Sequence, residues 1–447
     1  MLDLVWPDDQ RYSLSRNQFI GRPAEVLPQA VARCEGPADV REALELAADK
    51  GWPFAVRGGG HSNACHSSST GLVIDLSPAA TVLLSGNEVT VGAGVRTGQL
   101  ATFLASRELL VPAGSCPSVG LVGAALGGGF GSHGRTHGLT CDRLVAAEVV
   151  LADGRVVKAG ETEEPDLFWA LRGAGGGNFG VVTSATFAPV RSVARTHVRY
   201  SWDIAHAPRL IAIWQEWAPF APDDVSVELV LLSPDHPDDP PEVLLIGAGD
   251  VTGFVSGSPA PRLAEVERLS PAEAALLHAT PYSAVAHDPV SIQLTYSRPG
   301  MSTAKTEFFT QPLPQPAIQA LVEHFTAARE PGEMREVAFT PWGGAYSHVP
   351  PHATAFPHRQ ADYLVKHTVL VGPNGAARRG NEALAWLAAS WATIHPWGNG
   401  GAYPNFPDPA LTGWFTAYYG SNTQRLREVK AAYDPENVFR FAQSVPL

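Results

Sequence analysis

Several glycine-rich segments carry side chains that could take part in chemistry. Arg57-Gly-Gly-Gly-His61 follows a short apolar segment, and Gly129–Gly134 and Gly175–Gly180 both match the pattern G-x-G-x-x-G. A run of small residues lets backbone N–H groups approach an anion closely, which suits a pyrophosphate. Arg57 would add charge-assisted contacts to that anion. His61, at the end of the run, would then lie near the group that the pyrophosphate carries.

The two G-x-G-x-x-G matches are weak evidence for a nicotinamide dinucleotide site. Such a site needs a strand before the glycines, a helix after them and an acidic residue about 20 positions later. Leu121–Leu126, before the first match, does not form a clean buried strand, and the second match precedes a strand instead of a helix. Ordinary turns therefore stay open as an explanation for both matches.

Other polar side chains do not predict a site of their own. His133, His137 and Cys141 are spaced by four residues, which on a helix would place them on one face and suggest zinc. Gly134 and Gly138 disfavour that helix, and no fourth ligand is evident, so we predict no metal site. The chain also lacks the G-x-S-x-G elbow of the common serine hydrolases.

The elements that would position these groups follow from apolar spacing and turn signals. Residues 37–50 have the apolar spacing of a helix, with Pro37 and Asp39 at a suitable start. Residues 142–158 are typical of a hairpin that turns at Asp153-Gly154. The other elements expected in this half are strands at 54–57, 71–77, 88–95 and 181–187 and helices at 97–108 and 165–172.

The pattern changes in the second half of the chain. Long strands, some with alternating polarity, indicate an antiparallel sheet with helices as a separate unit. Residues 340–360 are rich in proline and are expected to be mostly loop. The expected strands are 197–204, 225–233, 243–251 and 290–297, and the expected helices are 208–217, 316–328, 381–394 and 423–433.

Composition limits the class of protein. The chain has 447 residues, of which 45% are hydrophobic and 17% charged, with a formal net charge of -12. The apolar content excludes disorder of the whole chain, and the acidic balance without a basic stripe argues against nucleic-acid and membrane partners. Four cysteines do not make a disulfide framework. Without a long apolar run or a signal-like N-terminus, we expect a cytoplasmic protein.

A set of seven segments together resembles one flavoprotein family. The segments are RGGGHS (57–62), GLVIDLS (71–77), GSCPSVG (114–120), GGGFG (127–131), GLTCDRL (138–144), residues 172–182 and YGSNTQRLREVKAAYDPENVFRFAQS (419–444). In this order they are similar to the berberine-bridge-enzyme-like oxidases of the vanillyl alcohol oxidase/p-cresol methylhydroxylase (PCMH) superfamily. The last segment is especially specific, whereas residues 195–335 match only in general character.

The resemblance implies an α+β, two-domain PCMH-type FAD-binding fold. Residues 1–192 would form the FAD-binding domain. Residues 193–400 would form a substrate-binding domain with an antiparallel sheet over the substrate pocket. Residues 401–447 would be a C-terminal berberine-bridge-like segment that returns to the FAD domain.

The resemblance also implies that FAD is bound covalently at two positions. His61 matches the residue bonded to the flavin 8α-methyl group, and Cys116 matches the residue bonded to ring carbon 6. A small buried hydrophobe stays open as the alternative for Cys116. Two tethers would hold the flavin firmly beside an open pocket and tune its electronics. The other residues expected near the cofactor are Arg57, Gly58, Gly59, Gly60, Ser62, Val119, Gly120, Gly123, Gly128, Gly129, Asp142, Val182 and Asn437.

Val119 matches the family position that gates access of dioxygen to the reduced flavin. Valine at this position goes with oxidases, and leucine with dehydrogenases. The resemblance therefore implies an oxidase that produces hydrogen peroxide. A role as a core valine is compatible with this interpretation.

The chain departs from the family at two tyrosine positions beside the flavin, one of which supplies the general base. These positions are Phe406, in AYPNFPD, and Phe130, in GGGFG. Neither residue has a phenol, so oxidation of a simple alcohol by hydride transfer would need another base. A simple alcohol must lose its hydroxyl proton during this oxidation. Phenols, enolisable dicarbonyls and amines either lose the corresponding proton more easily or do not carry it. The departure therefore favours such a natural-product substrate over a plain sugar.

Three residues are candidates for the missing base. Lys366 and His367 lie in the strand that follows Arg359, and strand alternation allows only one of the two to face the pocket. A buried lysine can have a depressed pKa and act as a base, although a solvated strand charge is the alternative. Tyr403 is the third candidate.

The sequence thus predicts an FAD-linked oxidase that oxidises a small molecule, in first place a secondary metabolite, with dioxygen as the acceptor. A carbohydrate oxidase is the alternative, and Trp342, Trp397 and Trp414 could line its sugar groove or belong to the core. A nicotinamide-dependent dehydrogenase or a flavin-free binding protein is a less favoured interpretation of the same glycine-rich segments. The sequence indicates no oligomeric state.

Overall fold

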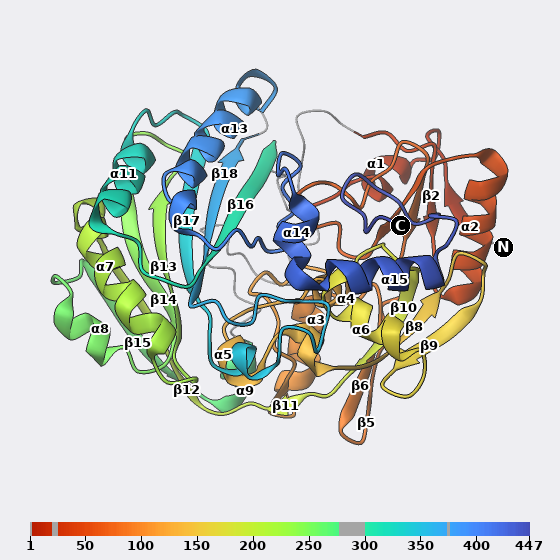
Figure 1. The fold of residues 1–447 in the computed structure, drawn as a ribbon, viewed down its shortest axis with the longest axis horizontal. Helices are drawn as coiled ribbons and strands as arrows, with labels where there is room; N and C mark the ends of the chain where they lie inside the picture. Colours follow the sequence, from red (N-terminus) through yellow and green to blue (C-terminus); the bar gives the residue numbers. More distant parts are fainter. Residues whose placement is uncertain (1, 20–25, 277–299, 373–375) are drawn as a thin grey trace.

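The computed structural model describes residues 2–19, 26–276, 300–372 and 376–447, which form two parts with different sheets (Figure 1). One part combines the first half of the chain with its C-terminal end. The other part is built on a single large antiparallel sheet. This arrangement agrees with the predicted two-domain α+β fold, while the domain boundaries at residues 192 and 400 stay a prediction.

The first part contains one mixed sheet and one antiparallel sheet. The strands of the mixed sheet, in spatial order, are β1 (Asp3–Val5), β2 (Ala30–Arg33), β4 (Leu72–Asp75) and β3 (Phe54–Arg57), and the last three run parallel. The strands of the antiparallel sheet are β5 (Val82–Ser85), β6 (Glu88–Gly92), β10 (Val181–Phe187), β8 (Leu144–Val150) and β9 (Val156–Gly160).

Helix α2 (Pro37–Lys50) provides the crossover from β2 to the parallel strand β3. Its start has proline in the first turn, and its end has Gly51 in the left-handed region with φ 63°. The helix buries the apolar stripe that the sequence predicted, which confirms the range 37–50. The buried residues are Val40, Ala43, Leu44 and Ala47.

The other elements expected in this part are also present. The hairpin β8–β9 turns at Asp153-Gly154, where Gly154 has φ 80°. Short helices accompany the sheets: α3 (Thr97–Ala105), α4 (Leu121–Leu126) and α6 (Pro165–Ala174). Leu121–Leu126 is therefore a helix, which explains why its sequence does not have the pattern of a buried strand.

The second part is a seven-stranded antiparallel sheet. Its strands, in spatial order, are β15 (Leu263–Leu269), β12 (Arg195–Asp203), β14 (Glu242–Ala248), β13 (Ser226–Ser233), β17 (Glu333–Pro341), β18 (Tyr363–Val371) and β16 (Met301–Phe309). Helices cover one face (Figure 1), and they are α7 (Ala207–Trp217), α11 (Gln315–Thr326) and α13 (Ala376–Ala392).

The two faces of this sheet have different roles because side chains alternate along a strand. Val365 and Val369 of β18 point into an apolar core that they share with Trp214 of α7, Leu321 of α11 and Leu387 of α13. The alternate residues of the same strands point to the opposite face. That face meets the first part, since the Thr306 hydroxyl accepts a hydrogen bond from the backbone N–H of Tyr403.

The C-terminal segment packs into the core of the first part. Helix α14 (Trp414–Tyr419) precedes α15 (Thr423–Tyr433), and α15 lies against α6. Buried side chains of this segment belong to the same core cluster as the first-half strands; they are Ala402, Tyr418, Tyr419, Leu426, Val429, Phe439 and Val445. No helix in the described part of the chain has the length and apolar character needed to cross a membrane.

The sequence patterns did not indicate β1, β2 and β5 of the first part, nor three strands of the seven-stranded sheet. β15 has mostly exposed, charged positions, as an edge strand allows, so it lacks an apolar pattern. β16 and β17 mix polar and apolar residues because both of their faces are covered by protein. The strand expected at 290–297 lies outside the described residues.

Candidate active site

His61 and Cys116, the two predicted attachment residues, meet at the side chain of Ser118. His61 Nε2 lies 3.1 Å from Ser118 Oγ, and Cys116 Sγ lies 3.3 Å from the same oxygen. The His61 ring stacks on Phe19, with ring centroids 3.7 Å apart and an angle of 15° between the planes. An imidazole and a thiol from segments 55 residues apart in sequence thus share one hydroxyl group.

Arg96 and two glycines hold the attachment loops together. Arg96 donates hydrogen bonds from Nη1 to the carbonyl oxygens of Gly59 (2.6 Å) and Ser118 (3.0 Å). A Cβ atom on Gly59 would lie 2.2 Å from the backbone nitrogen of Gly120, and a Cβ atom on Gly120 would lie 2.4 Å from that of Gly59. Both positions therefore need glycine, because any side chain would separate the loops.

The start of α3 supports the Cys116 loop. The Thr97 hydroxyl donates to the carbonyl oxygen of Cys116 (2.7 Å), and the Thr97 N–H donates to that of Val119 (2.9 Å). The Gly98 N–H donates to the carbonyl oxygen of Pro117 (3.0 Å). These bonds fix the backbone on both sides of Ser118.

His61 is a neutral imidazole at neutral pH. Burial and, to a smaller extent, the positive charge of Arg96 lower the pKa of His61 to about 3, while a hydrogen bond with the backbone of Ser118 opposes only part of this shift. A neutral imidazole keeps a ring lone pair, which is what a covalent bond to an electrophilic carbon needs.

The glycine run that precedes His61 fits a pyrophosphate. The backbone N–H groups of residues 58–62 donate no hydrogen bond within the described part of the chain. Gly60 has φ 69°, a left-handed conformation that favours glycine. Consecutive free N–H groups in such a loop form an anion-binding nest, so the donor set matches the phosphates of FAD.

Asn437 offers a second point of contact. Its Oδ1 atom is buried without a hydrogen-bond partner among the described residues, and its backbone has φ 50°. The Asp434 carboxylate fixes this turn by accepting the N–H groups of Val438 (2.8 Å) and Phe439 (2.9 Å). A buried acceptor without a donor is costly, and a hydroxyl or N–H group of the cofactor would satisfy it.

Arg57 does not have the predicted role in phosphate binding. All five guanidinium N–H donors are used inside the protein, which leaves none for an anion. The expectation of a direct contact is therefore wrong, and Arg57 instead ties the N-terminal segment to the loop after β3. Its acceptors are the carbonyl oxygens of Ser15, Arg16, Asn17 and Ser67 and the hydroxyl of Ser68.

Gly128 and Gly129 are also explained by packing. The Gly128 N–H donates to the carbonyl oxygen of Ala125 (3.0 Å), and the Gly129 N–H donates to the Tyr403 hydroxyl (2.8 Å). A Cβ atom on Gly129 would lie 2.3 Å from the Thr140 side chain. Their N–H groups are thus unavailable for phosphates, and a place near another part of the cofactor stays a prediction.

The remaining predicted cofactor residues have varied surroundings. Asp142 is held by Arg359, whose Nη1 and Nη2 lie 2.7 and 2.8 Å from its two oxygens. Val182 is buried in β10, and Gly123 is exposed on α4 with free space around it. Cofactor contacts by these residues, and by Ser62 and Val119, stay predictions.

Tyr403 is a structural residue and not a suitable base. Its ring is buried between Phe130 (centroids 5.0 Å apart) and Phe406 (5.4 Å). Its hydroxyl accepts hydrogen bonds from Gly129 N–H and from Asn405 Nδ2 (3.0 Å). Burial raises its pKa, so the phenol keeps its proton at neutral pH and cannot accept another.

Lys366 and His367 point to opposite faces of the sheet. His367 is buried on the helix-covered face, where Nδ1 lies 2.8 Å from the Ser390 hydroxyl of α13. It therefore cannot reach a pocket on the other face, and its predicted role as a base is wrong. Lys366 lies on the face toward the first part, with Nζ 5.3 Å from the centroid of the Phe406 ring.

Lys366 is a cation and not the lysine of depressed pKa that the sequence suggested. Burial alone would lower its pKa, but Glu336, whose Oε1 lies 2.9 Å from Nζ, and the charge of Glu228 raise it. Glu228 accepts a hydrogen bond from the Thr340 hydroxyl (2.9 Å), and burial raises its pKa. Sequence patterns missed both glutamates because only the register of β13, β17 and β18 brings them to Lys366.

Comparisons with known proteins agree with this geometry. The FAD binding domain family model matches residues 28–160, and the berberine and berberine-like model matches residues 402–446. The FAD-linked oxidoreductase YgaK of Bacillus subtilis is 33% identical over 461 residues, which cover 99% of this chain and 96% of YgaK. The chain belongs to the berberine-bridge-enzyme-like FAD-linked oxidoreductases. The predicted family is thereby confirmed.

Two further proteins show how far the similarity extends. The chitooligosaccharide oxidase of Gibberella zeae is 28% identical, and the alignment covers 94% of this chain and 87% of that protein. The structure of Physcomitrella patens BBE-like 1 superposes with a TM-score of 0.87 at 27% identity, over 100% of this chain and 97% of that one. The predicted two-domain fold is confirmed by this superposition.

In this berberine-bridge-like enzyme the three tryptophans considered for a sugar groove do not lie together. Trp342 is fully buried in the aromatic cluster around Phe356 and Tyr403. Trp397 and Trp414 are partly buried against two different cores. Trp342 is therefore a core residue, the other two pack against cores, and the three do not form one aromatic groove.

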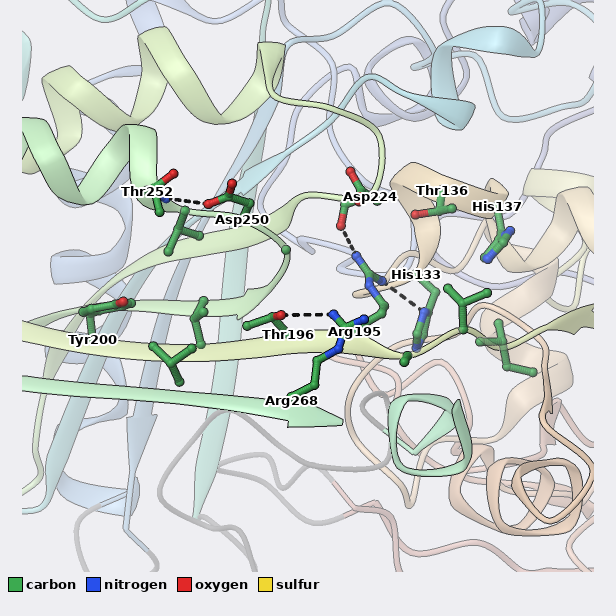
Figure 2. A pocket seen from close by; sticks show the side chains of 17 residues that line it. His133, Thr136, His137, Arg195, Thr196, Tyr200, Asp224, Asp250, Thr252 and Arg268 are labelled. Atoms are coloured by element: carbon green, nitrogen blue, oxygen red, sulfur yellow. Dashed lines mark hydrogen bonds between the residues drawn. The ribbon is translucent and has the colours of Figure 1, made fainter. Parts of the chain in front are cut away.

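A pocket of about 490 Å³ lies where the two parts of the enzyme meet (Figure 2). Arg195 of β12 crosses this junction and donates to the carbonyl oxygens of Ser132 (3.0 Å) and Asp224 and to His133 Nδ1 (3.2 Å). His133 Nε2 lies 2.8 Å from the carbonyl oxygen of Ala274, so both ring nitrogens of this histidine are hydrogen-bonded to groups at the junction of the two parts. Within the described ranges no group of three or more His, Cys, Asp or Glu side chains could hold a metal ion.

Proposed function

We propose that this enzyme is a bicovalent FAD oxidase that removes a hydride from a small secondary metabolite. The observation that carries the proposal is the convergence of His61 and Cys116 on the Ser118 hydroxyl. FAD, when bound, supplies the hydride acceptor and passes electrons to dioxygen, which becomes hydrogen peroxide. The protein supplies binding, orientation and charge.

The first task of the chain is to hold the cofactor. The free N–H groups of residues 58–62 would bind the pyrophosphate, and Asn437 Oδ1 would accept a hydrogen bond from the cofactor. Gly59 and Gly120 keep the two attachment loops in contact, so the bond-forming atoms of His61 and Cys116 are held on one side of the site.

Access of dioxygen is the task we assign to Val119. Its side chain follows Cys116 by three residues and is partly exposed. A small branched side chain at this position would leave room for dioxygen, which supports an oxidase over a dehydrogenase.

Charge control at the substrate is the task we assign to Lys366. Its ammonium group lies on the sheet face next to Phe406 and keeps donors that are not used by Glu336. A fixed cation stabilises the anionic form of a phenol or an enol, so such a substrate needs no strong base in the protein. This explains how the enzyme can function with phenylalanine at positions 130 and 406.

A carbohydrate oxidase is the second candidate. It is favoured by the similarity along nearly the whole chain to a protein described as a chitooligosaccharide oxidase. The core positions of Trp342, Trp397 and Trp414 weaken it, because sugars bind to exposed aromatic faces. Peroxide formation with a panel of phenols, enolisable dicarbonyls and oligosaccharides would separate the two candidates.

The mass of the denatured chain tests the covalent attachment. We expect the wild-type chain to carry one FAD, and a peptide map to locate it on both His61 and Cys116. His61→Ala and Cys116→Ala should each retain a single bond, and the double variant should release the flavin on denaturation. Cys34→Ala, a buried cysteine of another segment, is the matched control and should retain both bonds. A wild-type chain that weighs only its amino acids would refute the bicovalent proposal.

A further inference from the structure

The geometry around Ser118 goes beyond the naming of two attachment residues. Ser118 is not one of the groups that would bond to the cofactor, yet its hydroxyl is within hydrogen-bond distance of both. Its backbone is held by Arg96 and by the backbone N–H groups at the start of α3.

We propose that Ser118 is the positioning residue for both covalent attachments: its hydroxyl holds His61 in one tautomer and carries away the protons that His61 and Cys116 lose. The inference rests on the proposed function, since it concerns how the two bonds form. It assigns to Ser118 a role in assembly of the enzyme, which is separate from substrate oxidation.

The hydrogen bond to Ser118 selects the reactive nitrogen of His61. The bond engages Nε2, so Nδ1 is left to form the bond to the cofactor. If Nε2 carries the hydrogen and donates it to Ser118 Oγ, Nδ1 has the lone pair that a nucleophile needs. A ring that was free to exchange tautomers would present this lone pair only part of the time.

The attachments balance only if protons and electrons leave the site. Each attachment removes one hydrogen from the protein side chain (from Nε2 of His61 or from Sγ of Cys116) and one from a cofactor carbon, and it forms one bond, Nδ1–C or Sγ–C. Two protons and two electrons are released per bond. Dioxygen, the acceptor of the proposed oxidase, takes up both and becomes one hydrogen peroxide for each bond formed.

The surroundings explain why the protein-side protons need an acceptor. Arg96 lies beside the site, and its charge together with burial opposes a protonated His61. The proton therefore cannot stay on the imidazole after Nδ1 has reacted. Ser118 is partly exposed, so its hydroxyl can pass protons outward to water. Cys116 makes its side-chain hydrogen bond with the same hydroxyl, so the thiol proton can leave through Ser118 as well.

The test compares full-length variants by the mass of the denatured chain and by peptide maps of the two bonds. We expect Ser118→Ala to form both bonds about a hundredfold more slowly in the presence of FAD and dioxygen, as for loss of a general base. Ser118→Thr keeps the hydroxyl and should approach the wild-type rate. Thr97→Val is the matched control, because it removes a hydrogen bond to the Cys116 carbonyl oxygen but leaves the Ser118 hydroxyl in place.

The pH of the incubation separates proton transfer from loop support. In mildly alkaline buffer hydroxide replaces the missing acceptor, so bond formation in Ser118→Ala should recover towards the wild-type rate. Equal attachment in wild type and Ser118→Ala would overturn the inference. So would equal losses in Ser118→Ala and Thr97→Val, or a defect in Ser118→Ala that alkaline buffer does not relieve. A wild-type chain without bound flavin would instead refute the proposed function itself.

Discussion

Lys366 and His367 are neighbours in one strand, yet at neutral pH the lysine is charged and the histidine is neutral. His367 is fully buried and Lys366 is partly buried, and burial disfavours the charged form of each. Lys366 stays charged because the Glu336 carboxylate lies 2.9 Å away. His367 is hydrogen-bonded to the neutral Ser390 hydroxyl, and burial together with the charges of His324 and Lys305 lowers its pKa, so it loses its proton. The Glu336 carboxylate thus offsets the effect of burial on the pKa of Lys366.

Loss of the Lys366 charge should slow oxidation of the substrate. For a phenolic or enolic substrate we expect Lys366→Met to reduce the rate of anaerobic flavin reduction by about a hundredfold, the size of one lost oxyanion donor. Lys366→Arg keeps the charge and should recover much of the rate. His367→Gln, on the other face, should leave the rate unchanged. Equal rates in wild type and Lys366→Met would show that the ammonium does not act on the substrate.

His367 should make the protein sensitive to acid. Its pKa is about 3 in the folded chain and 6.5 for an ordinary histidine in an unfolded chain, so between these pH values only the unfolded chain binds the proton. Stability is therefore lost as the pH falls below about 6.5, by about 1.4 kcal/mol per pH unit for this one group.

Denaturant unfolding measures this effect. His367→Gln should lose less stability than the wild type when the pH changes from about 7 to about 5, and the difference should be about 2 kcal/mol. His236→Gln, at an exposed histidine, is the control and should follow the wild type. Parallel pH profiles for wild type and His367→Gln would contradict the assignment.

At the scale of elements, the site depends on two loops that touch through glycines. The loop after β3 and the loop before α4 have no strand pairing with each other. Their contact depends on the absence of side chains at Gly59 and Gly120 and on Arg96, which binds a carbonyl oxygen of each loop. Loops usually tolerate substitutions, but these two cannot separate without moving His61 away from Ser118.

Gly59→Ala should therefore disturb the attachment site. The added Cβ would meet the Gly120 backbone at 2.2 Å, and overpacking of this kind costs about 1–3 kcal/mol. We expect a lower unfolding midpoint and less covalent flavin by mass. Gly160→Ala is the control, because its Cβ would have ordinary room, with 3.6 Å to the nearest atom. Wild-type flavin content in Gly59→Ala would show that the contact between the loops is not required.

At the scale of the whole molecule, buried charges connect the two parts. Asp142 belongs to the first part, and Arg359 lies in the segment that leads into β18. Their side chains are 9% and 0% exposed, so the paired charges are almost removed from water. Arg195 makes a second connection across the junction pocket (Figure 2). These contacts hold the sheet face that carries Lys366 against the first part of the chain.

Removal of one member of the Asp142–Arg359 pair should be strongly destabilising. Arg359→Met leaves a buried, unpaired carboxylate and should lower the free energy of unfolding by about 3–5 kcal/mol. The double variant Asp142→Asn/Arg359→Met removes that charge and should recover part of the loss. Arg155→Met, which breaks an exposed pair with Asp153, should cause no measurable change. Equal stability of Arg359→Met and Arg155→Met would contradict the structural role of the pair.

The sequence by itself was sufficient for the family, for the α+β class and for most elements of the first part. These features depend on local signals: α2 has an apolar stripe with a proline start and a glycine end, and the β8–β9 hairpin has an Asp-Gly turn. The attachment motifs around His61 and Cys116 are local too, because each lies within a few residues of chain. The strands β15, β16 and β17 were missed because burial on both faces, or on neither, removes the alternation that marks a strand.

Only the tertiary structure decided which polar groups face one another. It brought Ser118 between His61 and Cys116, assigned Arg57 and Tyr403 to structural roles, and separated Lys366 from His367 across the sheet. It also placed Glu228 and Glu336 beside Lys366, which reversed the expected direction of the lysine pKa shift. The physical reason is that hydrogen bonds and charge interactions act through space over a few ångströms, between residues that are far apart in the chain.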